Sequence, residues 1–176
     1  YQLVFSYKTK TASLISYRTQ FPIETKSLLE RITLQVSNDA RKRGYEFTYD
    51  SSDSPVSHLI KIQEFSEWEK LPPIIFNYGV WQYTHFITQI ENSIGGKMNF
   101  EYAPSTYYRD DAGELNNKKI PFIIQTLIKK ISEDTVTGLK NIENYTYENA
   151  HYYFNESDIW GREYVGFWKV THTDAK

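Results

Sequence analysis

Aromatic side chains constrain the fold of this chain most strongly, since they make up 16% of its 176 residues while Cys is absent. Fifteen of the aromatic residues are Tyr, whose ring combines a large apolar body with one polar tip. Such rings suit strand interiors, the walls of ligand pockets and protein interfaces. Without Cys the chain forms neither disulfides nor a cysteine-dependent active site. The composition therefore favours recognition over redox or metal–thiolate chemistry.

The size and charge of the chain narrow its class further. A hydrophobic content of 40% with 24% charged residues is typical of a globular protein, and we expect a single domain over residues 1–176. The net charge of −2 gives no electrostatic footprint for nucleic acid. No stretch approaches 18 consecutive apolar residues, so we expect contact with a membrane only through flanking segments outside this sequence.

Helical spacing of apolar residues predicts several helices. Between residues 24 and 43 Leu28, Leu29, Ile32 and Val36 recur every three or four positions, and Gly44 follows as a stop. Together with residues 11–21 this stretch predicts a long N-terminal helical segment over residues 1–43, which packs on a sheet or on a second copy in a homodimer. Further helices are predicted at residues 66–69, 80–94 and 121–131.

Alternating or short apolar runs predict strands in the remainder of the chain. A hairpin is expected from residues 45–49 and 56–65 around the turn-rich stretch 50–55. The other expected strands cover residues 74–78, 97–102, 145–154 and 163–173. The last of these is apolar on both faces, which predicts a central position in the sheet or cover on both sides. The expected fold is an α+β domain, with residues 44–176 as its body around an antiparallel sheet.

Motifs for catalysis and metal binding are missing from the sequence. Four histidines, His58, His85, His151 and His172, show no metal-ligand spacing, so at least two of them would have to converge through the fold. The chain also lacks a nucleophile elbow and a phosphate-binding loop. We therefore expect no enzymatic activity, no metal and no cofactor.

The strongest candidate for a binding site combines rings with a few charges. Arg fixes a carboxylate through two parallel hydrogen bonds, Asp binds an amine, and the rings supply apolar walls. The opposing interpretation is that most of these rings belong to the core. The candidate ligand-binding residues are Trp81, Tyr83, Tyr102, Tyr107, Tyr108, Arg109, Asp110 and Trp168.

The order of the expected parts resembles the extracytoplasmic PAS-like sensor domains of bacterial receptors, the PDC or Cache group. The stretch Thr106-Tyr107-Tyr108-Arg109 is loosely similar to a mid-domain motif of that group. The resemblance implies a periplasmic or extracellular sensor domain of a membrane receptor that binds a small molecule over its sheet and acts in signal transduction. Two other classes remain open: an interaction or assembly domain of a cell-envelope complex, and a small α+β enzyme.

Overall fold

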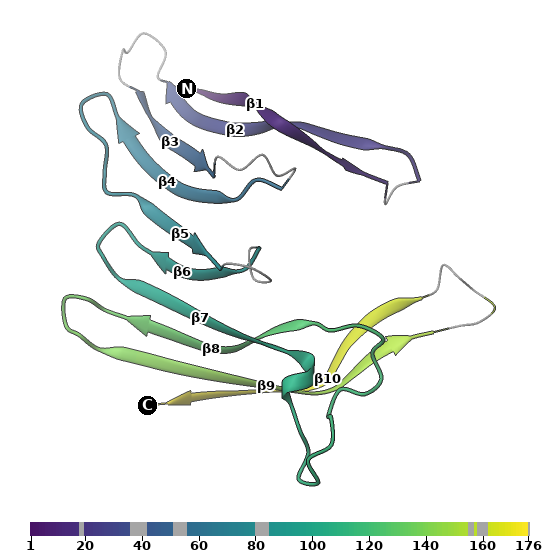
Figure 1. The fold of residues 1–176 in the computed structure, drawn as a ribbon. Helices are drawn as coiled ribbons and strands as arrows, with labels where there is room; N and C mark the ends of the chain where they lie inside the picture. Colours follow the sequence, from purple (N-terminus) through teal and green to yellow (C-terminus); the bar gives the residue numbers. More distant parts are fainter. Residues whose placement is uncertain are drawn as a thin grey trace. The chain divides into compact units, whose positions relative to one another are not determined.

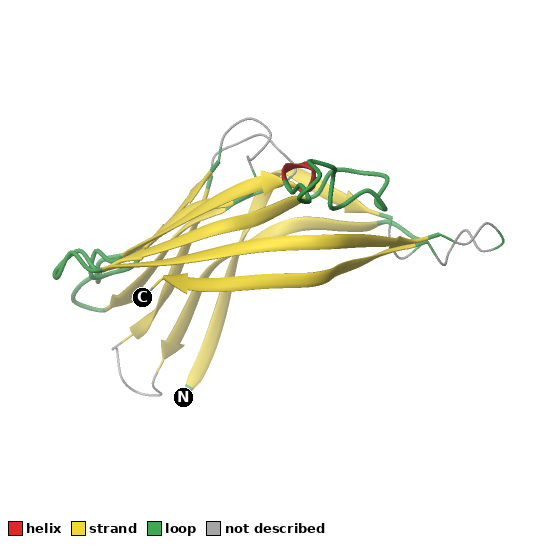
Figure 2. Cartoon of the chain, turned by 90° about the horizontal axis from the view of Figure 1, so that it is seen from below, coloured by secondary structure: helices red, strands yellow, loops and turns green. Residues whose placement is uncertain are grey.

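The computed structural model describes residues 1–17, 20–35, 42–50, 56–79, 85–154, 157 and 162–175. Regular structure in these ranges is almost entirely β-strand, with a short 3-10 helix at Ser105–Tyr107 (Figures 1 and 2). The expected α+β fold with a long N-terminal helix is therefore wrong. The chain divides into two units, Tyr1–Gly96 and Lys97–Lys176.

Unit 1 is an antiparallel meander, in which each strand pairs with the next one along the chain. Its strands are β1 (Gln2–Ser16), β2 (Ile23–Gln35), β3 (Lys42–Tyr49), β4 (Leu59–Ser66), β5 (Ile74–Tyr78) and β6 (Ile87–Glu91). Aromatic and β-branched residues are frequent in these segments, and such residues suit a pleated surface.

Unit 2 is also an antiparallel meander, built from β7 (Lys97–Pro104), β8 (Gln125–Glu133), β9 (Lys140–Tyr153) and β10 (Glu163–Ala175). A long connection, residues 105–124, joins β7 to β8 and begins with the 3-10 helix. Buried residues of this unit lie where the connection meets the strands, at Ala103, Ser105, Tyr108, Asn117, Thr126 and Ala150.

The strand predictions are largely confirmed. The expected hairpin corresponds to β3 and β4, and the predicted strand at residues 74–78 coincides with β5. The strands expected at residues 97–102, 145–154 and 163–173 correspond to β7, β9 and β10. One expectation about position is wrong, because β10 pairs with β9 alone among the described strands and exposes Val165, Trp168 and Val170.

Three of the predicted helices are strands that contain a β-bulge. Each has one extra residue opposite a register shift: Glu30 in β2, Thr88 in β6 and Ile128 in β8. A bulge changes the local spacing of side chains on one face from two residues to three. Leu29 and Ile32, for example, lie opposite Tyr7 and Phe5 of β1 at the same face of the sheet. The apparent helical period therefore arises from an interrupted strand period.

The two remaining helix predictions are also wrong. Residues 11–16 continue β1, and the predicted helix at residues 66–69 is a turn in which the Ser66 hydroxyl accepts the N–H groups of Trp68 and Glu69. The capping chemistry is thus present without a helix. Residues 36–41 and 80–84, which belonged to two predicted helices, lie outside the described residues. No helix in the described part of the chain is long and apolar enough to cross a membrane.

Candidate functional site

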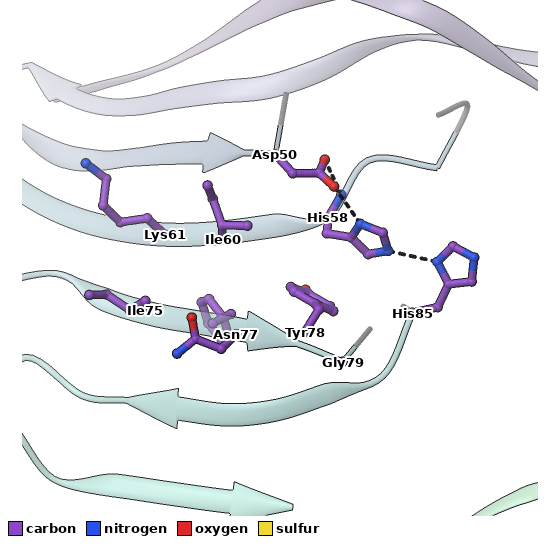
Figure 3. A pocket seen from close by; sticks show the side chains of 10 residues that line it. Asp50, His58, Ile60, Lys61, Ile75, Asn77, Tyr78, Gly79 and His85 are labelled. Carbon is purple, nitrogen blue, oxygen red and sulfur yellow. Dashed lines mark hydrogen bonds and ion pairs between the residues drawn. The ribbon is translucent and has the colours of Figure 1, made fainter. Parts of the chain in front are cut away.

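A cluster of Asp50, His58 and His85 lies where the β3–β4 and β5–β6 hairpins end (Figure 3). His58 Nδ1 lies 2.7 Å from Asp50 Oδ2, and His58 Nε2 lies 2.8 Å from His85 Nδ1. The backbone N–H of His58 also donates to Asp50 Oδ1 at 3.0 Å. The fold thus brings together two of the four histidines, as a hydrogen-bonded chain that starts from a carboxylate.

The cluster borders an open cavity of about 680 Å³ in unit 1. Ile60, Ile75, Phe76 and Tyr78 supply apolar walls, while Lys61 and Asn77 add polar groups. The Tyr78 ring lies 4.6 Å from the His58 ring, and its hydroxyl donates to the Leu59 carbonyl at 3.1 Å. Burial raises the pKa of Tyr78, and the nearby Asp50 charge adds to the effect, so this phenol stays neutral at physiological pH.

The register of unit 1 gives its sheet one apolar and one polar face. Directly paired residues of antiparallel strands share a face, and successive residues alternate between faces. One row across the sheet runs Phe5, Ile32, Tyr45 and Glu64, and another runs Phe47, Ile62, Ile74. Glu64 forms an ion pair with Arg43, which lies opposite Leu34 on the same face, but most of this side is apolar. We call this side the apolar face, and its apolar residues are Leu3, Phe5, Ile32, Leu34, Tyr45, Phe47, Ile62, Ile74, Phe76 and Ile90.

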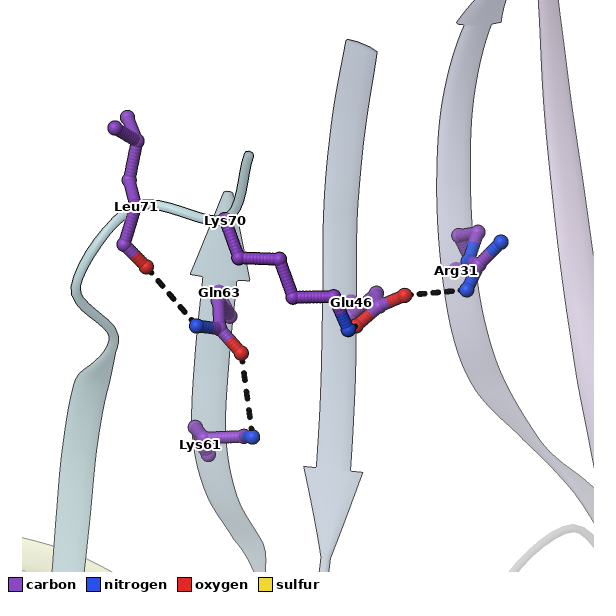
Figure 4. A network of polar contacts seen from close by, with 6 residues as sticks. All are labelled: Arg31, Glu46, Lys61, Gln63, Lys70 and Leu71. Atoms are coloured by element: carbon purple, nitrogen blue, oxygen red, sulfur yellow. Dashed lines mark hydrogen bonds and ion pairs between the residues drawn. The ribbon is translucent and has the colours of Figure 1, made fainter. Parts of the chain in front are cut away.

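The opposite face of unit 1 is dominated by paired charges and amides. Glu46 forms ion pairs with Arg31 of β2 and with Lys70, whose Nζ lies 2.5 Å from Glu46 Oε2 (Figure 4). These contacts, the hydrogen bond from Lys70 first, lower the pKa of Glu46. The Arg31 guanidinium also lies 5.0 Å from the centre of the Phe65 ring and covers this buried side chain. The polar face is therefore satisfied by its own contacts.

Apart from the Arg43–Glu64 ion pair, the apolar face has no such contacts or cover among the described residues. Leu3 is 59% exposed, Phe5 51% and Tyr45 46%, and none of the face's apolar residues is buried. Tyr7, which follows in the same alternation on β1, is 63% exposed. A stable sheet normally buries one face against a second layer. This face lacks that layer in the described structure.

The accessible surface of the chain agrees with an uncovered sheet. The chain exposes 12,736 Å², whereas a compact protein of 20.8 kDa exposes about 8,900 Å². Even two separate compact proteins of half that mass would together expose about 10,800 Å². The chain therefore exposes more surface than compact cores of this size would leave in contact with solvent.

In unit 2 the structure places four predicted binding residues in one connection. The Tyr107 and Tyr108 rings lie 5.6 Å apart in an edge-to-face contact, but Tyr107 is exposed and Tyr108 is buried. The Arg109 guanidinium donates to the Gly113 carbonyl at 3.3 Å. Asp110 Oδ1 accepts the backbone N–H groups of Ala112 and Glu114. Both charged groups thus bind backbone groups of their own turn.

Tyr108 and Asn117 hold this connection against the strands. Thr126 Oγ1 donates to the Ala103 carbonyl at 3.0 Å, so the Tyr108 hydroxyl, 2.7 Å away, donates to Thr126 Oγ1. Burial raises the pKa of Tyr108. Asn117 Nδ2 donates to the Ser105 and Tyr147 carbonyls, and Asn117 Oδ1 accepts the Ala150 N–H at 2.9 Å. These contacts join the connection to β8 and β9.

The other predicted binding residues lie apart from this connection or outside the description. Tyr102 lies on β7, where burial raises its pKa, and Trp168 lies on β10 with 87% exposure. Trp81 and Tyr83 are outside the described residues. The assignment of these residues to a ligand therefore stays a prediction. Within the described ranges no group of three His, Asp or Glu side chains is arranged to hold a metal ion.

The sequence analysis missed the apolar face. Leu3, Phe5 and Tyr7 alternate with Val4, Ser6 and Lys8, which is a strand pattern. This alternation was the available signal for β1. The convergence of His58 and His85 left no such pattern, because 27 positions separate them and hairpin pairing alone brings them together.

The fold and its surfaces define an all-β module with an uncovered apolar face, a property typical of interaction and assembly domains. The family model described as the insecticide toxin TcdB middle/N-terminal region matches residues 78–176, more than half of the chain. The chain belongs to this family. No curated protein and no solved structure matches it.

The family and the fold together correct the functional expectations. The resemblance to PAS-like sensor domains is wrong, because the matched family is a toxin region and the described structure is a strand meander without long helices. The expected role as a receptor's sensor domain in signal transduction is wrong for the same reason. The interaction or assembly alternative agrees better with both findings.

Proposed function

We propose that this chain is a structural assembly module of an insecticidal toxin, and that its apolar face packs against another part of that toxin. The observation that carries the proposal is the separation of the two faces of unit 1. Ion pairs and amide contacts satisfy the polar face, whereas Leu3, Phe5 and Tyr45 leave about half of their surface in solvent.

The energetics favour an occupied apolar face. A Phe side chain buries roughly 200 Å² when it is covered, so Phe5, which is 51% exposed, leaves about 100 Å² uncovered. Covering that area contributes about 2.5 kcal/mol at about 25 cal/mol per Å². Leu3, Tyr7 and Tyr45 are exposed to similar degrees, and their contributions add to that of Phe5. A second layer therefore gains several kcal/mol from this row of residues alone.

The family description supports a partner within the same toxin. It names a middle/N-terminal region, that is, one part of a larger protein. We infer that a neighbouring part of the toxin supplies the covering layer. The absence of enzymatic activity stays a prediction. A location outside the cytoplasm and small-molecule binding in unit 2 stay predictions.

The test compares one pair of substitutions in two settings. Phe5→Glu with Tyr45→Glu places two carboxylates on the apolar face, and we measure thermal unfolding in the isolated chain and in the complete toxin. In the isolated chain both residues are about half exposed, so the expected loss of stability is small. In the toxin the covering layer would bury both charges, so we expect a much larger fall in the unfolding midpoint and loss of assembly in size-exclusion chromatography.

Trp68→Glu is the matched control. Trp68 is a large exposed ring of the same unit, but it lies in the turn after β4, away from the apolar face. This control should leave the isolated chain and the toxin unchanged. Equal effects of the double substitution in the two settings would show that no layer covers the face, and the proposal would then be wrong.

A further inference from the structure

We infer that Asp50, His58 and His85 form a proton-operated latch that holds the β3–β4 hairpin to the β5–β6 hairpin and opens when both histidines are protonated. The inference goes beyond the proposed assembly role and does not depend on it. It starts from the geometry of the three side chains in Figure 3.

The partners of each ring nitrogen fix where the protons lie at neutral pH. An ionised Asp50 accepts hydrogen bonds only, so His58 Nδ1 at 2.7 Å carries a proton and donates it. A neutral His58 then has a lone pair on Nε2, which accepts from His85 Nδ1 at 2.8 Å. At the end of this series of hydrogen bonds, His85 Nε2 carries no proton. The carboxylate thereby sets the tautomer of both rings.

The same geometry distinguishes a first added proton from a second. The first binds at His85 Nε2 and leaves the contact between the rings intact, and the Asp50 charge favours it. The second would have to bind His58 Nε2, which places two N–H groups in the 2.8 Å gap between the rings. It would also make two cations of rings whose centres lie 5.0 Å apart. The latch therefore tolerates one extra proton and opens with two.

Other charged or titratable groups around the cavity do not replace this contact. Lys61 and Tyr78 also line it, but Lys61 Nζ donates to Gln63 and the Tyr78 hydroxyl donates to the Leu59 carbonyl. Tyr78 stays neutral because burial raises its pKa. Among the described side chains at the cavity, Asp50 is thus the anion, and the two histidines are the bases that can bind added protons.

The latch lies beside the weakest pairing in unit 1. The described register joins β4 to β5 at Lys61–Ile75 and Ile62–Ile74, whereas β3 and β4 pair along most of their length. Toward the hairpin ends the two strands are held by the Tyr78–Leu59 hydrogen bond and by the His58 contacts with Tyr78 and His85. Loss of the contact between the histidines removes one of few links at this end.

Hydrogen exchange at pH 7.5 and pH 5.0, corrected for intrinsic exchange rates, tests the latch in the 176-residue chain. We expect amides of residues 58–62 and 74–79 to lose about tenfold in protection at the lower pH, and amides of unit 2 to keep theirs. In His85→Gln only His58 can be protonated, and the substituted amide can turn its oxygen toward that ring, so two cations never face each other and protection should not depend on pH. His151→Gln, which removes an exposed histidine of unit 2, is the matched control and should behave like the unchanged chain.

Asp50→Asn keeps the inference testable if His85→Gln disrupts the hairpins. Without the negative charge at position 50, the closed arrangement of the two histidines binds added protons less favourably. The latch should therefore open at higher pH. An unchanged protection pattern at pH 5.0 in the original chain overturns the inference. It is likewise overturned if His85→Gln opens on acidification, or if Asp50→Asn leaves the opening pH unchanged or lowers it.

Discussion

Asn117 offers the sharpest test of how unit 2 is held together. Its side chain is 7% exposed and makes three hydrogen bonds, two to carbonyls and one from the Ala150 N–H. Asn117→Ala leaves those three backbone groups without their partner. At about 1 kcal/mol for each bond, the expected loss in the free energy of unfolding is about 3 kcal/mol.

Asn117→Asp separates the chemistry of the amide from its shape. The carboxylate keeps the size of the side chain but replaces the donor that lies 3.1 Å from the Ser105 carbonyl and 3.3 Å from the Tyr147 carbonyl. A buried anion facing two carbonyl oxygens should cost more than the truncation, about 4 kcal/mol. The new carboxyl prefers its neutral form in this place, so the cost at pH 7 should decrease at pH 4.

Urea unfolding followed by circular dichroism, together with hydrogen exchange over residues 105–124, measures both variants. Asn116→Ala is the control, because the Asn116 amide makes an exposed bond to the Arg109 carbonyl and should cost less than about 1 kcal/mol. If Asn117→Ala destabilises the chain no more than Asn116→Ala does, the buried amide does not anchor the connection.

Two further predictions concern unit 1. A Cβ at Gly44 would lie 1.9 Å from the Ile32 carbonyl oxygen, so Gly44→Ala should break the β2–β3 pairing and raise hydrogen exchange there. Gly113→Ala is the control, because a Cβ at Gly113 meets no atom within 4 Å. Its φ of +79° should cost about 1 kcal/mol. The lowered pKa of Glu46 means that its ion pairs stabilise the fold above the ordinary Glu value of 4.5 and that this stabilisation is lost as pH falls through the lower folded value. Urea titrations from pH 7 to pH 3 should show that the difference in stability between the original chain and Glu46→Gln decreases. Glu67→Gln, which removes an exposed carboxylate in the turn after β4, is the control for the loss of one negative charge.

Local patterns predicted the strands because those strands keep a period of two. Residues 45–49 and 74–78 alternate or form short apolar runs bounded by turn residues, and they became β3 and β5. Three of the helix errors share one physical cause. In β2, β6 and β8 one extra residue interrupts the alternation, and the resulting three-residue spacing is also the spacing of a helix face.

Gly95 and Gly96 show the same ambiguity at the end of an element. They follow directly after the predicted helix at residues 80–94, but they belong to a turn in which Asn92 Oδ1 accepts the N–H groups of Ile94 and Gly96. Gly95 has φ of +89°, which a turn and a helix end both use. The sequence therefore indicated a turn at these residues, but such a turn can follow either a helix or a strand.

The candidate site was less predictable than the strands. The apolar face depends on which residues of six neighbouring strands pair, and register follows from turns and bulges that a single sequence does not specify. The contact of His58 with His85 likewise requires two hairpins to end side by side. Composition did favour recognition over redox or metal–thiolate chemistry, and Tyr45 on the apolar face is one of the rings on which that inference rested.

Radical footprinting of aromatic side chains tests the central claim most directly, since it reports how far solvent reaches each ring. The account predicts that Phe5 and Tyr45 are oxidised readily in the isolated chain and are protected in the complete toxin, while Trp68 reacts equally in both. Equal oxidation of Phe5 and Tyr45 in the two samples would contradict the claim that the apolar face is an assembly surface.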